Sequence, residues 1–329
     1  MAHPREVKTD RNRVNGLPAT EVIHRWNHSD LNGIEMPITR KLTFVIAVNS
    51  REVFKSNFLA SPLLLGPHPH ELVVQEKFRS ATDAYNDAIN KSANDLIVFA
   101  HQDIIFPGYW LSQLERALEY LNVNDPHWGV LGCYGKSYEG SDCGHVYSSG
   151  RGIIGAPFTH PVPVQTLDEI VLVMRKSSGL RFDDQLPHFH LYGTDICLAA
   201  MKRGMKSYAI PAFCIHNTQQ HLIFPPEFYE CCRHIKRRWK EYLPIRTACT
   251  TITKYGVALF ARRLQEIFLR VRRKRVGGYR LQDPQELLTK FERYPSEAST
   301  EMGLSFLTRF SQRVLRRWIR TERGVPSIS

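Results

Sequence analysis

The sequence predicts an α/β fold in which a mixed, mostly parallel sheet is flanked by helices. Residues 42–48 and 96–100 are continuous apolar runs, which is the pattern of strands buried on both faces. A short strand at residues 71–75 and a helix at residues 80–91 lie between them. A strand–helix–strand unit of this size implies a right-handed parallel crossover, so we expect these strands to share one sheet.

The first predicted strand, residues 42–48, is rich in β-branched and aromatic side chains, which favour strands. It ends at Asn49 and Ser50, and a helix is expected over residues 51–60. Polar residues that follow an apolar strand either contact a nucleotide base or ribose, or cap the next helix. Asn49 is therefore a candidate nucleotide contact, with capping as the alternative.

The helix expected over residues 80–91 begins with a capping box. Ser80 is the cap, and Asp83 supplies the acid three residues later. Apolar residues then recur at helical spacing, at Ala81, Ala84, Tyr85, Ala88 and Ile89.

The central strand, residues 96–100, ends in residues that can bind a metal. His101 and Asp103 occupy alternate positions of an extended chain, so both side chains point the same way. Ligands of α/β sheets bind at the carboxyl ends of the strands. A carboxylate beside an imidazole at that place suits a divalent cation that holds phosphates. The alternative is a strand that stops in a polar turn.

The chain beyond Asp103 alternates further helices and strands. Helices are expected at residues 110–121 and 196–202, and strands at residues 128–134, 169–175 and 208–215. Residues 135–162 are rich in glycine and are expected to form a long irregular loop. So long a loop in a compact domain is usually functional or mobile, and this one is a candidate lid over a bound ligand.

Two more polar residues stand at the ends of predicted elements. Asp195 lies at the start of the helix at residues 196–202, where the helix dipole favours an ionised carboxylate. The alternative is that Asp195 only caps this helix. His216 follows the strand at residues 208–215, a place where a single histidine is normally structural.

The seven cysteines are odd in number and form no CxxC pair, which argues against a zinc ribbon or a disulfide framework. Residues 1–40 are polar and contain no apolar stretch of the signal-peptide type. No apolar run approaches the length of a transmembrane helix. The sequence therefore predicts a cytoplasmic protein, with the inner face of a membrane as a peripheral location.

The net charge of +12 is unevenly distributed. Residues 225–329 contain 23 basic and 10 acidic side chains, whereas the rest of the chain is nearly neutral. We therefore predict three parts: a polar leader at residues 1–40, a catalytic domain at residues 41–224, and a basic helical region at residues 225–329.

The basic region contains three amphipathic helical patterns. Their apolar positions are Phe228, Cys232, Ile235 and Trp239; then Val257, Phe260, Leu264, Ile267 and Val271; then Leu307, Phe310, Val314 and Trp318. Basic helices with aromatic residues suit docking on anionic lipid. The alternative is that the apolar faces pack on the catalytic domain and the arginines are solvated. No known nucleic-acid motif is present, so no nucleic-acid partner is expected.

The ordered set of motifs resembles the GT-A-fold glycosyltransferases of the family-2-like group, in particular a branch with His-Gln-Asp at the Asp-x-Asp position. The stretches that carry the resemblance are residues 84–89, 98–103, 167–169, 182–184, 189–198 and 215–216. It covers roughly residues 42–220. The resemblance implies a GT-A-type sheet and a sugar nucleotide as the donor.

The resemblance also implies roles for individual residues. Asp103 would hold a divalent cation, Mn²⁺ or Mg²⁺, on the donor diphosphate, and His216 would supply a further ligand. His101 replaces the first acid of the motif and would lie beside the donor. Asp195 would be the general base on the acceptor hydroxyl. Two donor contacts complete the set: Asn49 near the nucleotide base, and Glu76 near the nucleoside.

These residues predict a metal-dependent, inverting glycosyltransferase whose acceptor is a glycan or a lipid-linked saccharide. The cation would stabilise the charge of the leaving diphosphate, and a carboxylate would remove the acceptor proton. A shell of oxygen and imidazole ligands suits Mn²⁺ better than Mg²⁺. Two alternatives remain open: a non-catalytic sugar-nucleotide or glycan-binding protein of the same fold, and a nucleic-acid-binding protein that uses the basic tail.

Overall fold

The computed structural model describes residues 40–65, 68–218, 223–271, 281–292 and 294, without the side chains of residues 269–271. The predicted leader and the third amphipathic pattern of the tail lie outside these residues. All described residues belong to one compact unit.

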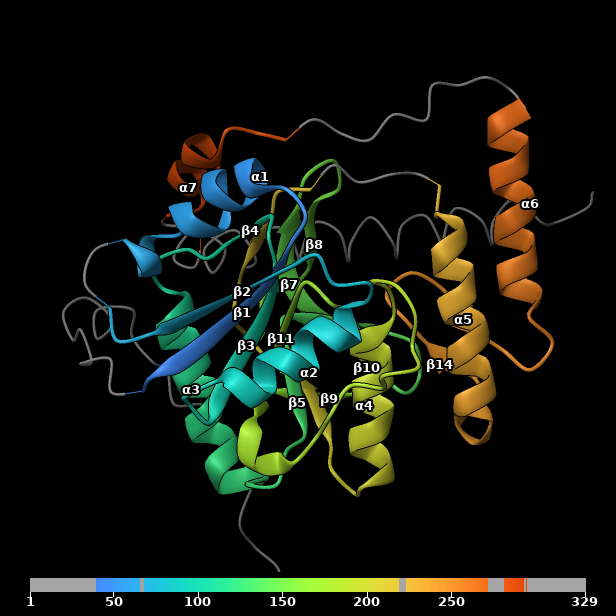
Figure 1. Ribbon diagram of the computed structural model, residues 1–329, viewed down its shortest axis with the longest axis horizontal. Coiled ribbons are helices and arrows are strands. Elements are labelled where there is room, and N and C mark those ends of the chain that lie inside the picture. The colour runs from blue at the N-terminus through green and yellow to red at the C-terminus, as the bar shows by residue number, and fades with distance from the viewer. Residues whose placement is uncertain (1–39, 66–67, 219–222, 272–280, 293, 295–329) are drawn as a thin grey trace, which may run out of the picture. The chain divides into compact units, whose positions relative to one another are not determined.

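The core of the fold is a seven-stranded mixed sheet with helices on both faces (Figure 1), as the sequence predicts. Its order is β2 (Glu71–Glu76), β1 (Leu42–Val48), β3 (Leu96–His101), β11 (Val171–Arg175), β5 (Val130–Gly132), β12 (Ser207–Ala209) and β9 (Val162–Val164). Strands β2, β1 and β3 pair in parallel, as do β5 and β12, whereas β11 and β9 pair antiparallel to their neighbours. Five of the seven strands thus share one direction.

Alternate residues of the central strands point into two separate hydrophobic clusters. Val45 and Phe99 face the cluster built by α2 (Ala81–Lys91), α4 (Tyr192–Lys202) and α5 (Pro226–Arg238). Phe44 and Val98 face the cluster built by α1 (Arg51–Ser56), the short 3-10 helix Phe58–Ala60, and α3 (Trp110–Asn124). Because β1 and β3 are buried on both faces, their sequences are continuously apolar.

A second sheet contains the segment that the sequence predicts to be irregular. Its order is β10 (Thr166–Leu167), β6 (Tyr134–Lys136), β7 (Asp142–Ser148), β13 (Ile215–His216) and β4 (Ile104–Ile105), and β8 (Gly152–Gly155) also pairs with β7. The glycine-rich loop is thus partly a β-meander. Gly144 has φ +135°, and a Cβ there would lie 2.4 Å from the Cys133 carbonyl oxygen, so close strand packing requires this glycine.

Two elements have different boundaries in the structure from those predicted from the sequence. The strand expected over residues 208–215 is split, so β12 belongs to the large sheet and β13 to the second one. Helix α4 begins at Tyr192 rather than at residue 196, so Asp195 lies within its first turn and Leu191 takes the N-cap position. The hydrogen bonds of the tertiary structure, and not the local pattern, determine both changes.

The described part of the basic region contains α5, α6 (Val257–Val271), α7 (Pro284–Phe291), and a hairpin of β14 (Ile245–Arg246) and β15 (Thr251–Ile252). The first amphipathic pattern packs on the domain, because Phe228, Cys232, Ile235 and Trp239 are buried in the same cluster as α2 and α4. The division of the chain at residue 225 remains a prediction. No described helix combines the length and the apolarity that crossing a membrane requires.

Candidate metal and nucleotide site

Three potential metal ligands converge where β3 meets the second sheet. His101 is the last residue of β3, and Asp103 follows two residues later. Strand β13 pairs with β4 so that His216 lies opposite Ile104, which brings its imidazole to the same place. One ligand atom from each of His101, Asp103 and His216 lies within 4.8 Å of the others. The structure thus brings together residues that are 115 positions apart in the sequence.

The carboxylate of Asp103 lies at the centre of this cluster. His216 Nε2 is 3.3 Å from Asp103 Oδ1, and His101 Nδ1 is 4.0 Å from the same oxygen. The backbone N–H of Asn217 donates to the Asp103 carbonyl oxygen at 2.9 Å, which fixes the chain at this point. Asp103 therefore faces both imidazoles at once.

The electrostatics of the cluster keep Asp103 ionised. Burial of Asp103 opposes its ionisation, but His216 and then His101 outweigh this effect and lower its pKa to about 2. Burial also disfavours a charged His216, yet Asp103 raises the pKa of His216 above its usual value. For His101, burial dominates and its pKa falls. A carboxylate and two imidazoles with this charge distribution fit a divalent cation, and the donor set suits Mn²⁺, Fe²⁺ or Zn²⁺.

Metal affinity is expected to rise with pH through the pKa of His216. That pKa is raised, so below it a proton on His216 competes with the cation, and above it the imidazole is a free ligand. His101, whose pKa is lowered, is neutral over the same range. Calorimetric titration with Mn²⁺ should give an affinity at least about tenfold higher near pH 8 than near pH 6. Equal affinities at the two pH values would exclude His216 as a ligand.

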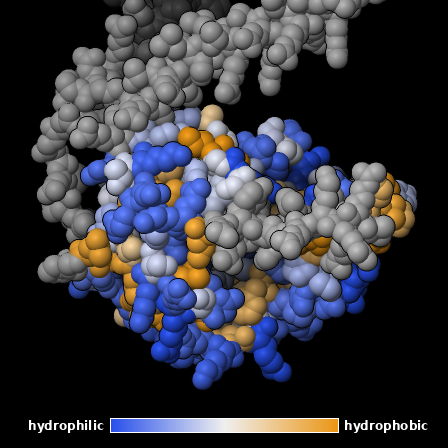
Figure 2. All heavy atoms as spheres, turned by 90° about the horizontal axis from the view of Figure 1, so that it is seen from above, coloured by the Kyte–Doolittle hydropathy of each residue, from blue (hydrophilic) through white to orange (hydrophobic). Residues whose placement is uncertain are grey.

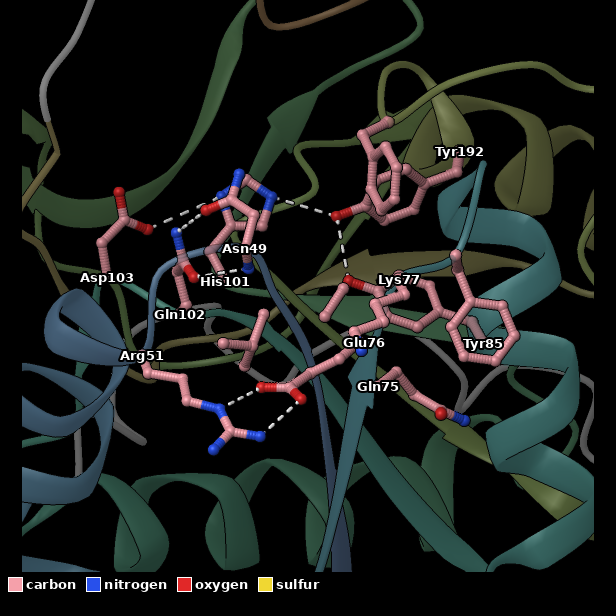
Figure 3. A pocket seen from close by; sticks show the side chains of 14 residues that line it. Asn49, Arg51, Gln75, Glu76, Lys77, Tyr85, His101, Gln102, Asp103 and Tyr192 are labelled. Atoms are coloured by element: carbon pink, nitrogen blue, oxygen red, sulfur yellow. Dashed lines mark hydrogen bonds and ion pairs between the residues drawn. The ribbon is translucent and has the colours of Figure 1, made fainter.

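A cavity of about 780 Å³ opens beside Asp103 at the carboxyl ends of β1, β2 and β3 (Figure 3). Its lining includes Asn49, Glu76, His101 and Asp103, all four of which the sequence predicts to contact a donor. The remaining lining residues are Ala47, Val48, Arg51, Gln75, Lys77, Phe78, Tyr85, Gln102, Phe189 and Tyr192. This is the strand edge at which ligands of α/β sheets bind.

Gln102 holds the ends of β1 and β3 together. Its Oε1 accepts from the backbone N–H groups of Asn49 and Ser50, each at 3.0 Å, and its Nε2 donates to Asn49 Oδ1 at 2.5 Å. Ser50 in turn caps α1 by accepting from the N–H of Val53. Gln102 thereby fixes the orientation of the Asn49 side chain, a role that the sequence pattern does not reveal.

Arg51 and Glu76 form a bidentate ion pair across the cavity wall, with two N–O distances of 2.8 Å. The hydrogen bond from Arg51 lowers the pKa of Glu76. Because Arg51 already engages both carboxylate oxygens, a nucleoside that contacts Glu76 must share it with this guanidinium. Arg51 is a further cavity residue that sequence reasoning missed.

Two tyrosines orient His101. The Tyr192 hydroxyl lies 3.0 Å from His101 Nε2 and 3.5 Å from the Tyr85 hydroxyl (Figure 3). With Nε2 engaged by Tyr192, Nδ1 of His101 is directed at Asp103. Hydrogen bonds of this kind fix the ring orientation of metal-binding histidines. Tyr85 lies on the helix predicted at residues 80–91, where the pattern marks it only as a core residue. Tyr192 precedes the helix predicted at residues 196–202, and sequence reasoning gave it no role.

Asp168 and Glu169 form an acidic pair close to the cluster. Burial lowers the pKa of His101, and the charge of Asp168 opposes this shift; Asp168 also adds to the raised pKa of His216, after Asp103. Burial, and then Asp168, raise the pKa of Glu169 well above its usual value, although the backbone N–H groups of Gly193 and Leu191 favour its ionised form. Glu169 therefore lies close to the start of α4, a position that sequence reasoning did not predict.

The structure does not bring Asp195 to the cavity. Its side chain is fully buried, and Oδ1 accepts from Trp239 Nε1 at 2.6 Å and lies 3.4 Å from Arg238 Nε. Burial raises the pKa of Asp195. Its Oδ2 has no hydrogen-bond partner among the described residues. In the same network Asp183 contacts His234 and Arg238, each at 2.7 Å. The predicted base is thus hydrogen-bonded to Trp239 and does not line the cavity, although it is only one helical turn from Tyr192, which does.

No family model matches this sequence. One protein with detectable sequence similarity is "ATP synthase subunits region ORF 6" of Fuscovulum blasticum, which is 27% identical over 157 residues. That alignment covers 46% of this chain and 61% of the other protein, so it spans less than two thirds of the relative's length.

Solved structures with similarity include S. aureus TarS 1-349 in complex with UDP-GlcNAc, with a TM-score of 0.37 and 13% identity over 60% of this chain and 66% of that chain. Another is the mannosyltransferase PcManGT from Pyrobaculum calidifontis in complex with GDP-Man and Mn²⁺, with a TM-score of 0.36 and 11% identity over 86% and 84% of the two chains. A197 from STIV gives a TM-score of 0.31 at 13% identity. Scores this low establish no shared family.

Proposed function

We propose that this protein is a metal-dependent, inverting glycosyltransferase that moves a sugar from a nucleotide-diphosphate donor to a hydroxyl group of a glycan or lipid-linked saccharide. The observation that carries the proposal is the convergence of Asp103, His216 and His101, of which Asp103 and His101 line the 780 Å³ cavity. A diphosphate donor requires a set of metal-binding side chains beside a cavity large enough for a nucleotide. The resemblance of the sequence motifs points to the same donor class.

The donor would lie with its diphosphate at Asp103 and its nucleoside toward β1 and β2. Asn49 and Glu76 offer hydrogen-bond partners to a base or ribose. A cation held by Asp103 and His216 supplies positive charge for the departing diphosphate, and Mn²⁺ is the cation that we propose first. His101, oriented by Tyr192, would complete the ligand set.

The acceptor side of the site needs a carboxylate to remove the hydroxyl proton. We propose Asp195 for this role, acting in a conformation in which Trp239 no longer covers it. Its unpartnered Oδ2 is a free acceptor, and its raised pKa suits a proton acceptor. Direct displacement by the activated hydroxyl would invert the anomeric centre.

A non-catalytic sugar-nucleotide or glycan-binding protein of the same fold is the second candidate. The specific observation in its favour is the complete burial of Asp195, which leaves the cavity without its predicted base. Both candidates require donor binding, but only the transferase consumes the donor.

The two candidates are separated by a binding measurement followed by a turnover measurement. UDP, GDP and ADP are screened by thermal shift with and without Mn²⁺. One of them is expected to raise Tm only with the metal, because ligand at about 100 times Kd adds about 2.7 kcal/mol of stability. The corresponding sugar nucleotides are then tested for metal-dependent release of the nucleoside diphosphate. Binding without release supports the second candidate, and no metal-dependent shift with any nucleotide contradicts both.

A further inference from the structure

Helix α6 is attached to the domain by its polar side. Glu266 is 3% exposed, and its carboxylate accepts from the backbone N–H of Phe224 at 3.1 Å and from the Tyr229 hydroxyl at 2.7 Å. The guanidinium of Arg262, one turn earlier, lies 3.2 Å from the same carboxylate and over the Phe224 ring. Leu259 is the apolar residue of this side that packs on the core.

Helix α6 lies beside α5 (Figure 1), and its opposite side is apolar. Its exposed residues are Val257 at 67%, Phe260 at 65%, Leu264 at 50% and Ile267 at 50%. They recur at intervals of three and four residues and therefore form one stripe. An amphipathic helix normally buries its apolar stripe, and α5 does so. Helix α6 instead exposes its apolar stripe and packs its polar side on the domain. Over the rest of the described surface, seen from above, hydrophobic side chains are scattered among hydrophilic ones (Figure 2).

The charge of the chain within and directly after α6 determines which partner the stripe fits. Residues 257–280 contain eight basic side chains, and their single acidic residue is the buried Glu266. The basic residues are Arg262, Arg263, Arg270, Arg272, Arg273, Lys274, Arg275 and Arg280. A partner that covers the stripe must therefore be apolar and negatively charged.

Two occupants from this chain itself do not satisfy that requirement. A second copy of the chain would bring a second segment 257–280, with eight more basic side chains. The amphipathic C-terminal segment, residues 295–329, contains six basic and three acidic side chains and is itself positive. Like charges placed together oppose association, whereas an anionic lipid surface offers both acyl chains and negative headgroups.

We propose that α6 docks on an anionic lipid bilayer, with the stripe of Val257, Phe260, Leu264 and Ile267 inserted at the boundary of headgroups and acyl chains. The basic residues of segment 257–280 would then attract the negatively charged headgroups, as in interfacial helices. This inference does not depend on the proposed transferase activity. It also identifies α6, rather than α5, as the membrane-facing element of the described basic region.

Vesicle flotation of the full chain tests the proposal. Vesicles of phosphatidylcholine alone are compared with vesicles that also contain phosphatidylglycerol. Binding is expected to be at least about tenfold stronger to the anionic vesicles, and to weaken as salt is raised, because anionic lipid attracts each basic residue and salt screens that attraction. The double variant Phe260→Ser/Leu264→Ser should bind the anionic vesicles at least about tenfold more weakly, since it loses most of the inserted apolar area.

The double variant Leu65→Ser/Val123→Ser is the matched control. Leu65 and Val123 are 63% and 82% exposed and lie outside α6, so this variant should bind vesicles within about twofold of the wild type. Equal flotation of the two double variants would overturn the proposal, as would absence of binding to anionic vesicles. A dimer that the α6 variant dissociates would assign the stripe to a second copy instead. Salt-sensitive binding to duplex DNA without vesicle binding would assign the arginines to nucleic acid.

Discussion

Replacing Asp103 by alanine is expected to abolish Mn²⁺-dependent nucleotide binding, with a loss in metal affinity of at least about 100-fold. Asp103 is the only anion of the three-residue cluster, and its oxygen Oδ1 faces both His101 and His216. Without this carboxylate, the two imidazoles face each other with no negative charge between them, and a dication loses its strongest electrostatic partner.

Calorimetric titration with Mn²⁺, followed by thermal shift with the preferred nucleotide, measures this effect. Asp184→Ala is the matched control, because Asp184 is an exposed aspartate that does not line the cavity. It should retain the wild-type affinity for metal. If Asp103→Ala bound Mn²⁺ as tightly as this control, the metal would lie elsewhere and the proposed donor site would lose its main support.

Replacing Asp195 by alanine is expected to lower the free energy of unfolding by about 3 kcal/mol. The fully buried carboxylate accepts the hydrogen bond of Trp239 Nε1 and faces Arg238. Alanine would leave the indole N–H without its acceptor and would open a polar cavity. We expect a loss of stability at the lower end of the range for buried charge pairs. Arg238 is 38% exposed, and it keeps its ion pair with Asp183 in the variant.

Urea unfolding of Asp195→Ala, Asp195→Asn and the exposed Asp184→Ala distinguishes a structural role from a catalytic one. Asparagine keeps an oxygen for Trp239, so it should recover more than half of the lost stability. As a base, however, asparagine fails, so Asp195→Asn should bind donor normally and lose turnover. Full turnover in Asp195→Asn would exclude Asp195 as the base, and unchanged stability in Asp195→Ala would contradict the network described here.

The sequence pattern was sufficient for the elements whose signal is local. Strands β1 and β3 are buried on both faces, so their apolar runs are unbroken and their positions are confirmed. His101 and Asp103 do lie near each other, but residues 102–103 form a turn, so the alternation of an extended chain is not the reason. Helices α2 and α3 match their expected positions because their apolar residues recur at helical spacing.

The features that the sequence pattern predicted wrongly or left open depend on distant partners. The glycine-rich segment reads as a loop, but its glycines permit the close strand pairing of β6, β7 and β8. Helices α5 and α6 have similar amphipathic patterns in the sequence, yet one buries its apolar side and the other exposes it. Glu266, which anchors α6 by its polar side, decides the difference.

The sequence by itself determined three features. These are the succession of strand, helix and strand over residues 71–100, the excess of basic residues in the last third of the chain, and a carboxylate and an imidazole at the end of β3. The local pattern gave His216 no functional role and only the family resemblance implied one; the pairing of β13 with β4 is what brings it to them. The tertiary structure also decided that Asp195 is hydrogen-bonded to Trp239, outside the cavity. The physical reason is the same in both cases: a side chain's partners are chosen by long-range packing, which leaves no periodic signal in the local sequence.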